Sequence, residues 1–328
     1  MLKPGRGKNS LFAAVVVCVN LWSLGSFAQS YPVKPIRLIV GYSPGGGTDI
    51  TARAVAQKLT ESLGQTVVVE NRPGATGAIA AERVATSPAD GYTLLMNSAN
   101  DTILPALRRK LPFDVERGFS PVSLVVTAPM AIIVHPSVPA HNVKQLIALA
   151  RSKPGKLSFG SAGTGNTTHL AGELFKFMAK VNIVHVPYKG SADSIIATAT
   201  GQLDMSIASV AAATPMLNVG RLRALAVTSA KRVSSVPSLP TIAESGLPGF
   251  DYASWFGVAA PAGVPKDIIA RLNTEIGKAV NTLEMKERFS KLGLEVETNT
   301  PEKFAALIHS EIEKNGKLVE FADLKKVD

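Results

Sequence analysis

The sequence predicts an α/β protein made of two lobes, and two observations support this prediction. Short apolar or β-branched runs alternate with amphipathic segments between residues 36 and 227, which is the pattern of a parallel sheet with helical crossovers. The same local plan, a strand followed by a glycine-rich loop and a helix, occurs after residue 40 and again after residue 160. We therefore expect two lobes, each a mainly parallel sheet flanked by helices, joined by two crossover segments.

Residues 1–28 have the pattern of a secretory signal peptide. Basic residues precede an apolar run at 11–24, and Ser26-Phe27-Ala28 has the small-x-small form of a cleavage site. The expected mature chain begins at Gln29. The only cysteine, Cys18, lies inside this leader, so the exported protein would depend on its core rather than on disulfides. No later stretch is long and apolar enough to cross a membrane.

The first strand is expected at 36–40, and the first helix presents one apolar face from Ala52 to Leu63 before Gly64 ends it. A helix N-terminus carries unpaired N–H groups and the positive end of the macrodipole, so the loop between them can hold a carboxylate or phosphate without arginine. The alternative is a tight turn with Thr48 or Asp49 as N-cap. The candidate binding residues of this loop are Tyr42, Ser43, Gly45, Gly46, Gly47, Thr48 and Asp49.

The chain then continues the alternation. We expect a strand at 66–70, a helix at 78–85 and a strand at 92–96, and then a loop, 97–100, that contributes Ser98. In a parallel sheet this loop and the first glycine loop should be neighbours at the carboxyl ends of the strands. A strand over 122–134, broken at Pro129, would leave the first lobe.

The second lobe repeats the plan. A helix at 143–151 and a strand at 157–160 lead into a second loop of glycine and hydroxyl residues, and the helix after it is expected to bury Leu170, Leu174, Phe177 and Met178. The candidate binding residues here are Ser161, Ala162, Gly163, Thr164, Gly165, Asn166, Thr167 and His169. Strands at 183–186, 203–208 and 223–227 and a helix at 192–200 complete the lobe.

The last third returns to the first lobe. We expect a strand at 254–259 and helices at 265–282, 284–292 and 301–321, with Pro265 and Pro301 in the first turns of their helices. The predicted division is residues 29–128 and 229–328 for lobe 1 and residues 129–228 for lobe 2. Hinges are expected at 127–129 and 228–230.

Catalytic and cofactor signatures are largely absent. Gly47 stands where a P-loop needs lysine, and neither glycine loop has a third dinucleotide-binding glycine. The five histidines lie apart in sequence, so no metal or other cofactor is expected. Nucleic acid is a poor partner for a chain with 6% aromatic residues and scattered basic residues, although a net charge of +10 favours anions.

The ordered motifs resemble the periplasmic solute-binding proteins of the tripartite tricarboxylate transporter family, also called Bug proteins. The resemblance covers the whole expected mature chain. Its carriers are the segments 31–40, Pro44 to Asp49, Val69 to Gly74, Asp90-Gly91-Tyr92, Ser161 to Leu170, His185 to Gly190, Leu222 to Val227 and Trp255-Phe256-Gly257.

This resemblance implies a type II-like periplasmic-binding-protein fold that closes over one small carboxylate, without catalysis, and delivers it to a two-subunit membrane permease. By the same match, N–H groups of both glycine loops would grip the carboxylate oxygens, and we expect a monomer. Ser209 and Trp255 complete the candidate site. Ala208 and Ser209 replace the family's polar pair, which favours a bulkier or aromatic carboxylate over an amino acid.

Two rival interpretations stay open on the sequence alone. One is an exported hydrolase of carboxylate esters that uses Ser161 with His169, although Phe159 stands where a nucleophile elbow has glycine. The other is a periplasmic sensor that reports the bound carboxylate to a membrane signalling protein.

Overall fold

The computed structural model of the chain describes Met1 and residues 31–326. It divides into the segment Met1–Val33 and a compact unit, Lys34–Asp328; all that follows concerns the second unit. The predicted signal peptide, its cleavage site and Cys18 lie outside the described residues. Among the helices that are described, none combines the length and apolar character required to cross a bilayer.

The unit holds two sheets. The first has the order β11–β4–β10–β3–β1–β2 and the second the order β7–β6–β8–β5–β9. The strands of the first sheet are β1 (Ile36–Val40), β2 (Val67–Asn71), β3 (Thr93–Ser98), β4 (Phe119–Ala128), β10 (Ser254–Pro261) and β11 (Glu295–Val296). Those of the second are β5 (Met130–Val134), β6 (Ser158–Ser161), β7 (Val184–Pro187), β8 (Met205–Ser209) and β9 (Arg223–Val227).

Both sheets follow one plan. The triples β2–β1–β3 and β7–β6–β8 are parallel, and each is followed by an antiparallel strand, β10 or β5. The parallel triples agree with the expectation from the alternating pattern. The antiparallel strands were not expected. Strands β10 and β5 run antiparallel to their neighbours because the chain enters each sheet through one of them after crossing from the other sheet. The two crossings lie between β4 and β5, at Pro129, and between β9 and β10.

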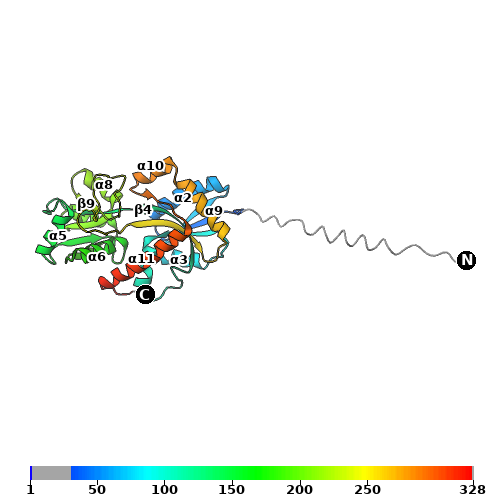
Figure 1. Cartoon of the computed structure of the whole chain (residues 1–328), viewed down its shortest axis with the longest axis horizontal. Coiled ribbons are helices and arrows are strands. Elements are labelled where there is room, and N and C mark those ends of the chain that lie inside the picture. The colour runs from blue at the N-terminus through cyan, green and yellow to red at the C-terminus, as the bar shows by residue number, and fades with distance from the viewer. Residues whose placement is uncertain (2–30, 327–328) are drawn as a thin grey trace. The chain divides into compact units, whose positions relative to one another are not determined.

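Helices surround the sheets (Figure 1), with α2, α3, α9 and α10 beside the first sheet and α5, α6 and α8 beside the second. The helices are α2 (Gly47–Leu63), α3 (Ala78–Ala85), α4 (Leu104–Leu107), α5 (Val143–Ser152), α6 (Thr167–Ala179), α7 (Ser191–Ala199), α8 (Val210–Asn218), α9 (Lys266–Val280), α10 (Leu283–Lys291) and α11 (Pro301–Phe321), with short 3-10 segments η1 (Ala75–Gly77) and η2 (Ala99–Ile103). Most lie within a few residues of their predicted bounds. Helices α4 and α8 were not predicted.

Three local predictions need correction. Phe177 of α6 is 54% exposed, whereas Phe175 is 1% exposed and fills the core. The other predicted residues of this face, Leu170, Leu174 and Met178, do pack in or against the core cluster. Helix α2 begins at Gly47 with Gly46 as N-cap, which rules out Thr48 and Asp49 as caps. Pro265 is the N-cap of α9 rather than a first-turn residue.

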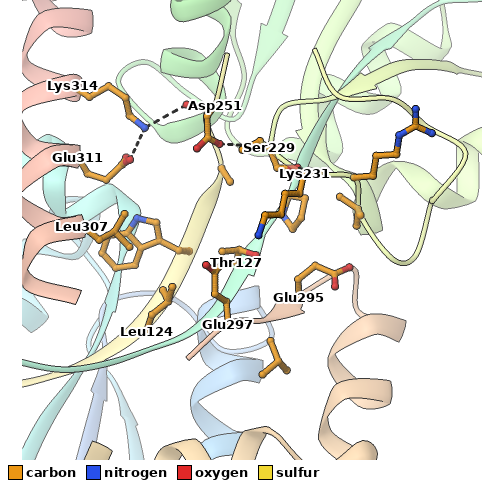
Figure 2. Close-up of a pocket in the computed structure, with 17 residues that line it drawn as sticks. Leu124, Thr127, Ser229, Lys231, Asp251, Glu295, Glu297, Leu307, Glu311 and Lys314 are labelled. Atoms are coloured by element: carbon orange, nitrogen blue, oxygen red, sulfur yellow. Dashed lines mark hydrogen bonds and ion pairs between the residues drawn. The ribbon is translucent and has the colours of Figure 1, made fainter. Parts of the chain in front are cut away.

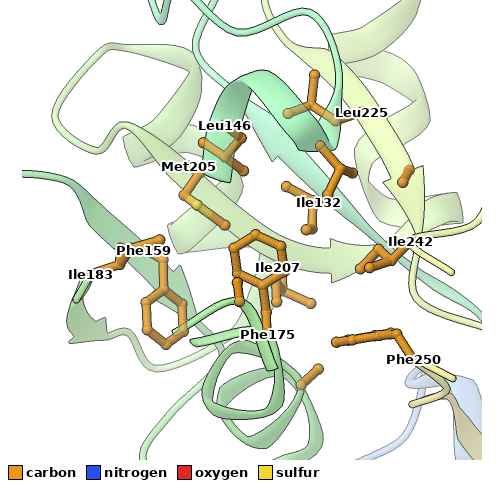
Figure 3. Packing of buried hydrophobic residues seen from close by; sticks show 14 of the residues in the cluster. Ile132, Leu146, Phe159, Phe175, Ile183, Met205, Ile207, Leu225, Ile242 and Phe250 are labelled. Atoms are coloured by element: carbon orange, nitrogen blue, oxygen red, sulfur yellow. The ribbon is translucent and has the colours of Figure 1, made fainter. Parts of the chain in front are cut away.

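A large core cluster lies under the second sheet, where Phe159, Phe175, Met205 and Ile207 pack together (Figure 3). Side chains from outside that sheet join the same cluster: Ile103 from η2, Leu318 and Val319 from α11, and Phe250 and Tyr252 from the segment that leads into β10. The two sheets are therefore linked by shared apolar packing as well as by two stretches of chain. This packing brings η2, which follows β3, close to α6.

Candidate functional site

The first glycine loop connects the central strand β1 of a parallel triple to α2. Its shape is held by one side chain, because Asp49 Oδ2 accepts a hydrogen bond from Gly45 N at 2.9 Å. Arg53 Nε and Asn71 Nδ2 donate to the same carboxylate at 3.0 Å and 2.9 Å. Burial opposes the negative charge, but these hydrogen bonds outweigh it and hold the pKa of Asp49 below its usual value. The Asp49 carboxylate therefore has a structural role: it holds the shape of the loop.

Three N–H groups at the start of α2 remain available. Within the described residues, the amides of Gly47, Thr48 and Asp49 have no acceptor, as is normal for the first turn of a helix. Gly46 caps this turn without a side-chain hydrogen bond. Phe256 of β10 forms a wall beside it, since a Cβ built on Gly47 would lie 3.2 Å from that ring. Phe256 is the neighbour of Trp255, the aromatic residue predicted from the sequence to belong to the site.

Tyr42 connects this loop to the end of β3. Its hydroxyl lies 3.1 Å from Ser98 Oγ, as the prediction that the two loops are neighbours requires. Burial and the neighbouring Asp101 raise the pKa of Tyr42, so the phenol stays protonated and can donate. Of the predicted residues of the first loop, Tyr42 and Asp49 make hydrogen bonds through their side chains, and Gly45 makes one through its N–H group.

Asp101 is a residue that sequence reasoning missed. It lies at the third position of η2, and its carboxylate accepts from Ser98 N at 2.7 Å while Ser98 caps the turn reciprocally. The spacing Ser98-x-x-Asp101 is a capping-box signal and could have indicated this pairing. The side chain is 4% exposed, and burial raises its pKa to about 7.

The second glycine loop connects β6 to α6 and differs from the first in one respect: its N–H groups are already used. Ala162 N donates to Thr168 Oγ1 at 2.8 Å, Gly163 N to Ser161 Oγ at 3.2 Å, and Gly165 N to His169 Nδ1 at 3.0 Å. Asn166 Oδ1 caps α6 by accepting from Thr168 N and His169 N. Thr164 N is the one amide from 162 to 169 without an acceptor in the described chain.

The second loop also contacts η2 and α4. Thr167 N donates to Asn100 Oδ1 at 3.2 Å, and a Cβ on Gly165 would lie 2.5 Å from Leu107 Cδ1. Because η2 follows β3 in the first sheet, these contacts bring the predicted binding loops of the two sheets to one region. Asn100 touches both sides, since its side chain also hydrogen-bonds to Tyr42.

Two histidines that lie apart in sequence meet behind the second loop. The rings of His169 and His185 stack with centroids 3.6 Å apart. Ser161 Oγ lies 2.6 Å from His185 Nε2, whereas His169 accepts from Gly165 N and faces Glu173. The predicted Ser161–His169 dyad is therefore absent. Burial and the neighbouring His169 lower the pKa of His185 to about 3.

Two candidate residues lie away from both loops. Trp255 projects from the face of β10 opposite to Phe256, where it packs edge-on against Phe304 with ring centroids 5.3 Å apart. Ser209 ends β8 and caps α8, and its strand partner is Met130 at the first crossing. The structure does not bring either residue to the glycine loops.

Trp255 instead lines a cavity of about 450 Å³ beside the crossing segments. Thr127 and Pro129 contribute from one crossing and Ser229 and Ala230 from the other. Figure 2 shows Lys314 beside Glu311 and the Asp251 backbone on one side of this cavity, and Glu295 and Glu297 on another. No residue of either glycine loop lines it. Among the described residues, no three metal-binding side chains form a cluster.

Both the sequence and the fold are similar to those of known proteins. A model of the tripartite tricarboxylate transporter family receptor matches residues 51–324. The chain belongs to that family. BugT of Bordetella pertussis is 36% identical over 289 residues, which cover 88% of this chain and 89% of BugT.

Solved structures agree with this assignment. A structure of an R. palustris protein with adipate is 37% identical, has a TM-score of 0.78 and covers 90% of this chain and 100% of that one. MatC from Rhodopseudomonas palustris with bound malate is 30% identical, has a TM-score of 0.73 and covers 88% of this chain and 100% of MatC. The chain is thus a solute-binding receptor of the Bug type with the two-lobed fold of periplasmic binding proteins, and not an enzyme.

Proposed function

We propose that this receptor binds a small carboxylate in the periplasm, between the first glycine loop and η2 on one side and the second glycine loop on the other. The observation that carries the proposal is the set of three unpaired N–H groups at the start of α2. They lie at the positive end of a helix of 17 residues, where an anion is stabilised by both hydrogen bonds and the macrodipole. The adipate and malate in the two related structures belong to the same chemical class.

The expected affinity is consistent with a transport receptor. Charge-assisted hydrogen bonds contribute about 1.5 to 3 kcal/mol each, so three of them, with the Tyr42 hydroxyl and closure of the two sheets, support roughly micromolar binding, near −8 kcal/mol. The second loop contributes less to this sum, because its amides already donate to side chains. Its Asn100 contact instead favours the closed arrangement.

The remaining parts of the proposal concern the whole chain. Residues 1–28 direct export, residues 29–128 with 229–328 and residues 129–228 form the two lobes, and hinges lie at 127–129 and 228–230. The liganded receptor docks on a two-subunit membrane permease. Ala208 is buried in an apolar core cluster and Ser209 lies away from both loops, so these two residues do not support the predicted preference for bulkier carboxylates.

A thermal-shift screen of dicarboxylates, tricarboxylates, amino acids and aromatic acids tests the binding function, with titration calorimetry on every hit. We expect stabilisation by carboxylates with one-to-one stoichiometry, and recovery of the ligand unchanged. Methyl esters of the same acids are the matched control, because they lack the charge that the helix start requires. Equal stabilisation by acid and ester would reject the carboxylate site.

A further inference from the structure

The buried carboxyl group of Asp101 lies at the proposed binding region without a positive partner. Its oxygen Oδ2 accepts from Asn97 Nδ2 and Ser98 N, both at 2.7 Å. Gly77 makes room for the other oxygen, since a Cβ there would lie 2.9 Å from Oδ1. A carboxylate buried among neutral donors is costly unless it binds a proton.

Among the described residues, no positively charged group forms a hydrogen bond or ion pair with Asp101. The end of β1 contributes Tyr42, η1 contributes Gly77, and β3 contributes Asn97 and Ser98. From α11, Asn315 reaches η2 through Thr102 at 2.8 Å, and the charged residues of that helix face, Glu311 and Lys314, pair with each other. From β10, Phe256 pairs with Ser98. Tyr42 is the one other titratable group in this set.

A neighbouring side chain is suited to both protonation states of Asp101. Asn97 is 6% exposed, and its Oδ1 is buried without a hydrogen-bond donor among the described residues. In the structure, Asn97 Nδ2 donates a hydrogen bond to Asp101 Oδ2, an arrangement that suits an ionised carboxylate. A half-turn of the carboxamide would present Oδ1 to a protonated Asp101, which would then donate to it.

Asp101 is also coupled to the groups that face the ligand. Its charge raises the pKa of Tyr42, so its field reaches the phenol beside the first loop. Ser98, which it caps, touches that phenol, and Asn100, the preceding residue, touches the second loop. An anion placed among these groups would be repelled by an ionised Asp101 across a medium of low dielectric constant.

We propose that Asp101 takes up a proton from solvent when the carboxylate enters, so that this receptor binds its anionic ligand together with one proton. The proposal rests on the carboxylate-binding function proposed above. The burial of Asp101 sets its pKa at about 7 in the free protein, and the ligand's negative charge raises it further. Affinity therefore decreases as pH rises above about 7, by up to tenfold per pH unit, until the higher pKa of the complex is reached.

Calorimetry in buffers of different ionisation enthalpy measures this proton directly. Adipate and malate, titrated at pH 7.5 where both are fully ionised, should give an apparent binding enthalpy that varies with the buffer and corresponds to uptake of about half a proton or more. Asp101→Asn keeps the acceptor for Ser98 N and should bind without uptake and with an affinity that is flat from pH 6.5 to 8.5. Asp114→Asn is the matched control, because Asp114 also accepts two N–H groups, both from the backbone, but lies at the surface.

The outcomes separate the two proposals. If no carboxylate binds, the proposed function fails; if carboxylates bind without proton uptake, or if Asp101→Asn retains the uptake, only the role of Asp101 fails. Uptake that persists in Asp101→Asn would point to the histidines of the second loop. If Asp101→Asn does not fold, carboxyl ¹³C NMR of the unmodified protein replaces it: one aspartate should titrate near pH 7 and shift upward with adipate, and the absence of such a signal would overturn the proposal.

Discussion

The two glycine loops occupy the same position in their sheets but differ in their hydrogen bonding. Both follow the central strand of a parallel triple and both open a helix. Among the described residues, the first leaves the N–H groups of Gly47, Thr48 and Asp49 unpaired, while the second donates its own to Ser161, Thr168 and His169. We therefore propose the first loop as the anion site, because most N–H groups of the second already have acceptors. The difference shows that composition alone does not make an anion site, because the same hydroxyl and amide side chains can occupy it.

The largest expected effect concerns packing. Gly45 and Gly165 both have positive φ, 85° and 75°, but a Cβ on Gly45 meets nothing within 4 Å whereas one on Gly165 meets Leu107 at 2.5 Å. Gly165→Ala should therefore cost about 2 to 5 kcal/mol of unfolding free energy, from backbone strain together with overpacking. Gly45→Ala should cost only the strain, about 1 kcal/mol. Urea denaturation of both variants measures the difference, and equal losses would show that the second loop does not press on α4.

The next effect is in the pH dependence of stability. It should have opposite sign for Asp101, which lies beside the first loop, and for His185, which lies behind the second loop. Asp101 has a folded pKa raised to about 7, so its contribution to stability is lost as pH rises from about 4 to 7. His185 has a folded pKa lowered to about 3, so its contribution is lost as pH falls below about 6.5.

Melting temperatures of the matched variants check both signs. Asp101→Asn should gain stability relative to the unmodified protein as pH increases from 5 to 8, by several degrees. His185→Gln should flatten the loss below pH 6.5, although it removes the contact with Ser161. Parallel curves for the variants and the parent would refute the assignment.

A smaller effect should follow from removing one acceptor in the second loop. Thr168→Val deletes the oxygen that accepts from Ala162 N, leaving a partly buried amide unpaired at a cost of about 1 to 2 kcal/mol. Thr168→Ser keeps the hydroxyl and should cost less than half as much. If Thr168→Val also bound adipate more tightly, the freed Ala162 N–H group would be shown to bind the ligand once Thr168 no longer occupies it. If neither stability nor affinity changed, this hydrogen bond would be unimportant.

Much of the fold could be predicted because its signals are local. Apolar strands, glycine-rich loops and amphipathic helices alternate along the chain, and the repeat after residues 40 and 160 indicated two similar sheets. The antiparallel strands β5 and β10 could not be foreseen, since their direction depends on how the chain crosses between sheets. Phe175 and Phe177 of α6 differ only in helical phase, which a short apolar pattern leaves ambiguous.

The candidate site was predictable in outline and less so in detail. The first loop and its neighbour Ser98 follow from sheet topology. The meeting of His169 and His185 depends on the pairing of β6 with β7, which sets Phe159 opposite His185, and no sequence spacing shows that. Asp101 was overlooked because an aspartate after a strand is usually solvated, and only the fold buries it. Trp255 and Phe256 lie on opposite faces of β10, so a strand prediction without a register could not choose between them.

The central claim is that the unpaired N–H groups at the start of α2 hold the carboxylate. Gly47→Pro removes one of them while fitting the first position of a helix after an extended Gly46, and Gly47→Ala keeps it while placing the same Cβ against Phe256. The most direct measurement is the affinity of both variants for adipate and malate by calorimetry, at matched melting temperature. We expect Gly47→Ala to bind nearly as well as the unmodified protein and Gly47→Pro to bind about tenfold or more weakly. Equal affinity of the two variants would contradict a role of these N–H groups in binding.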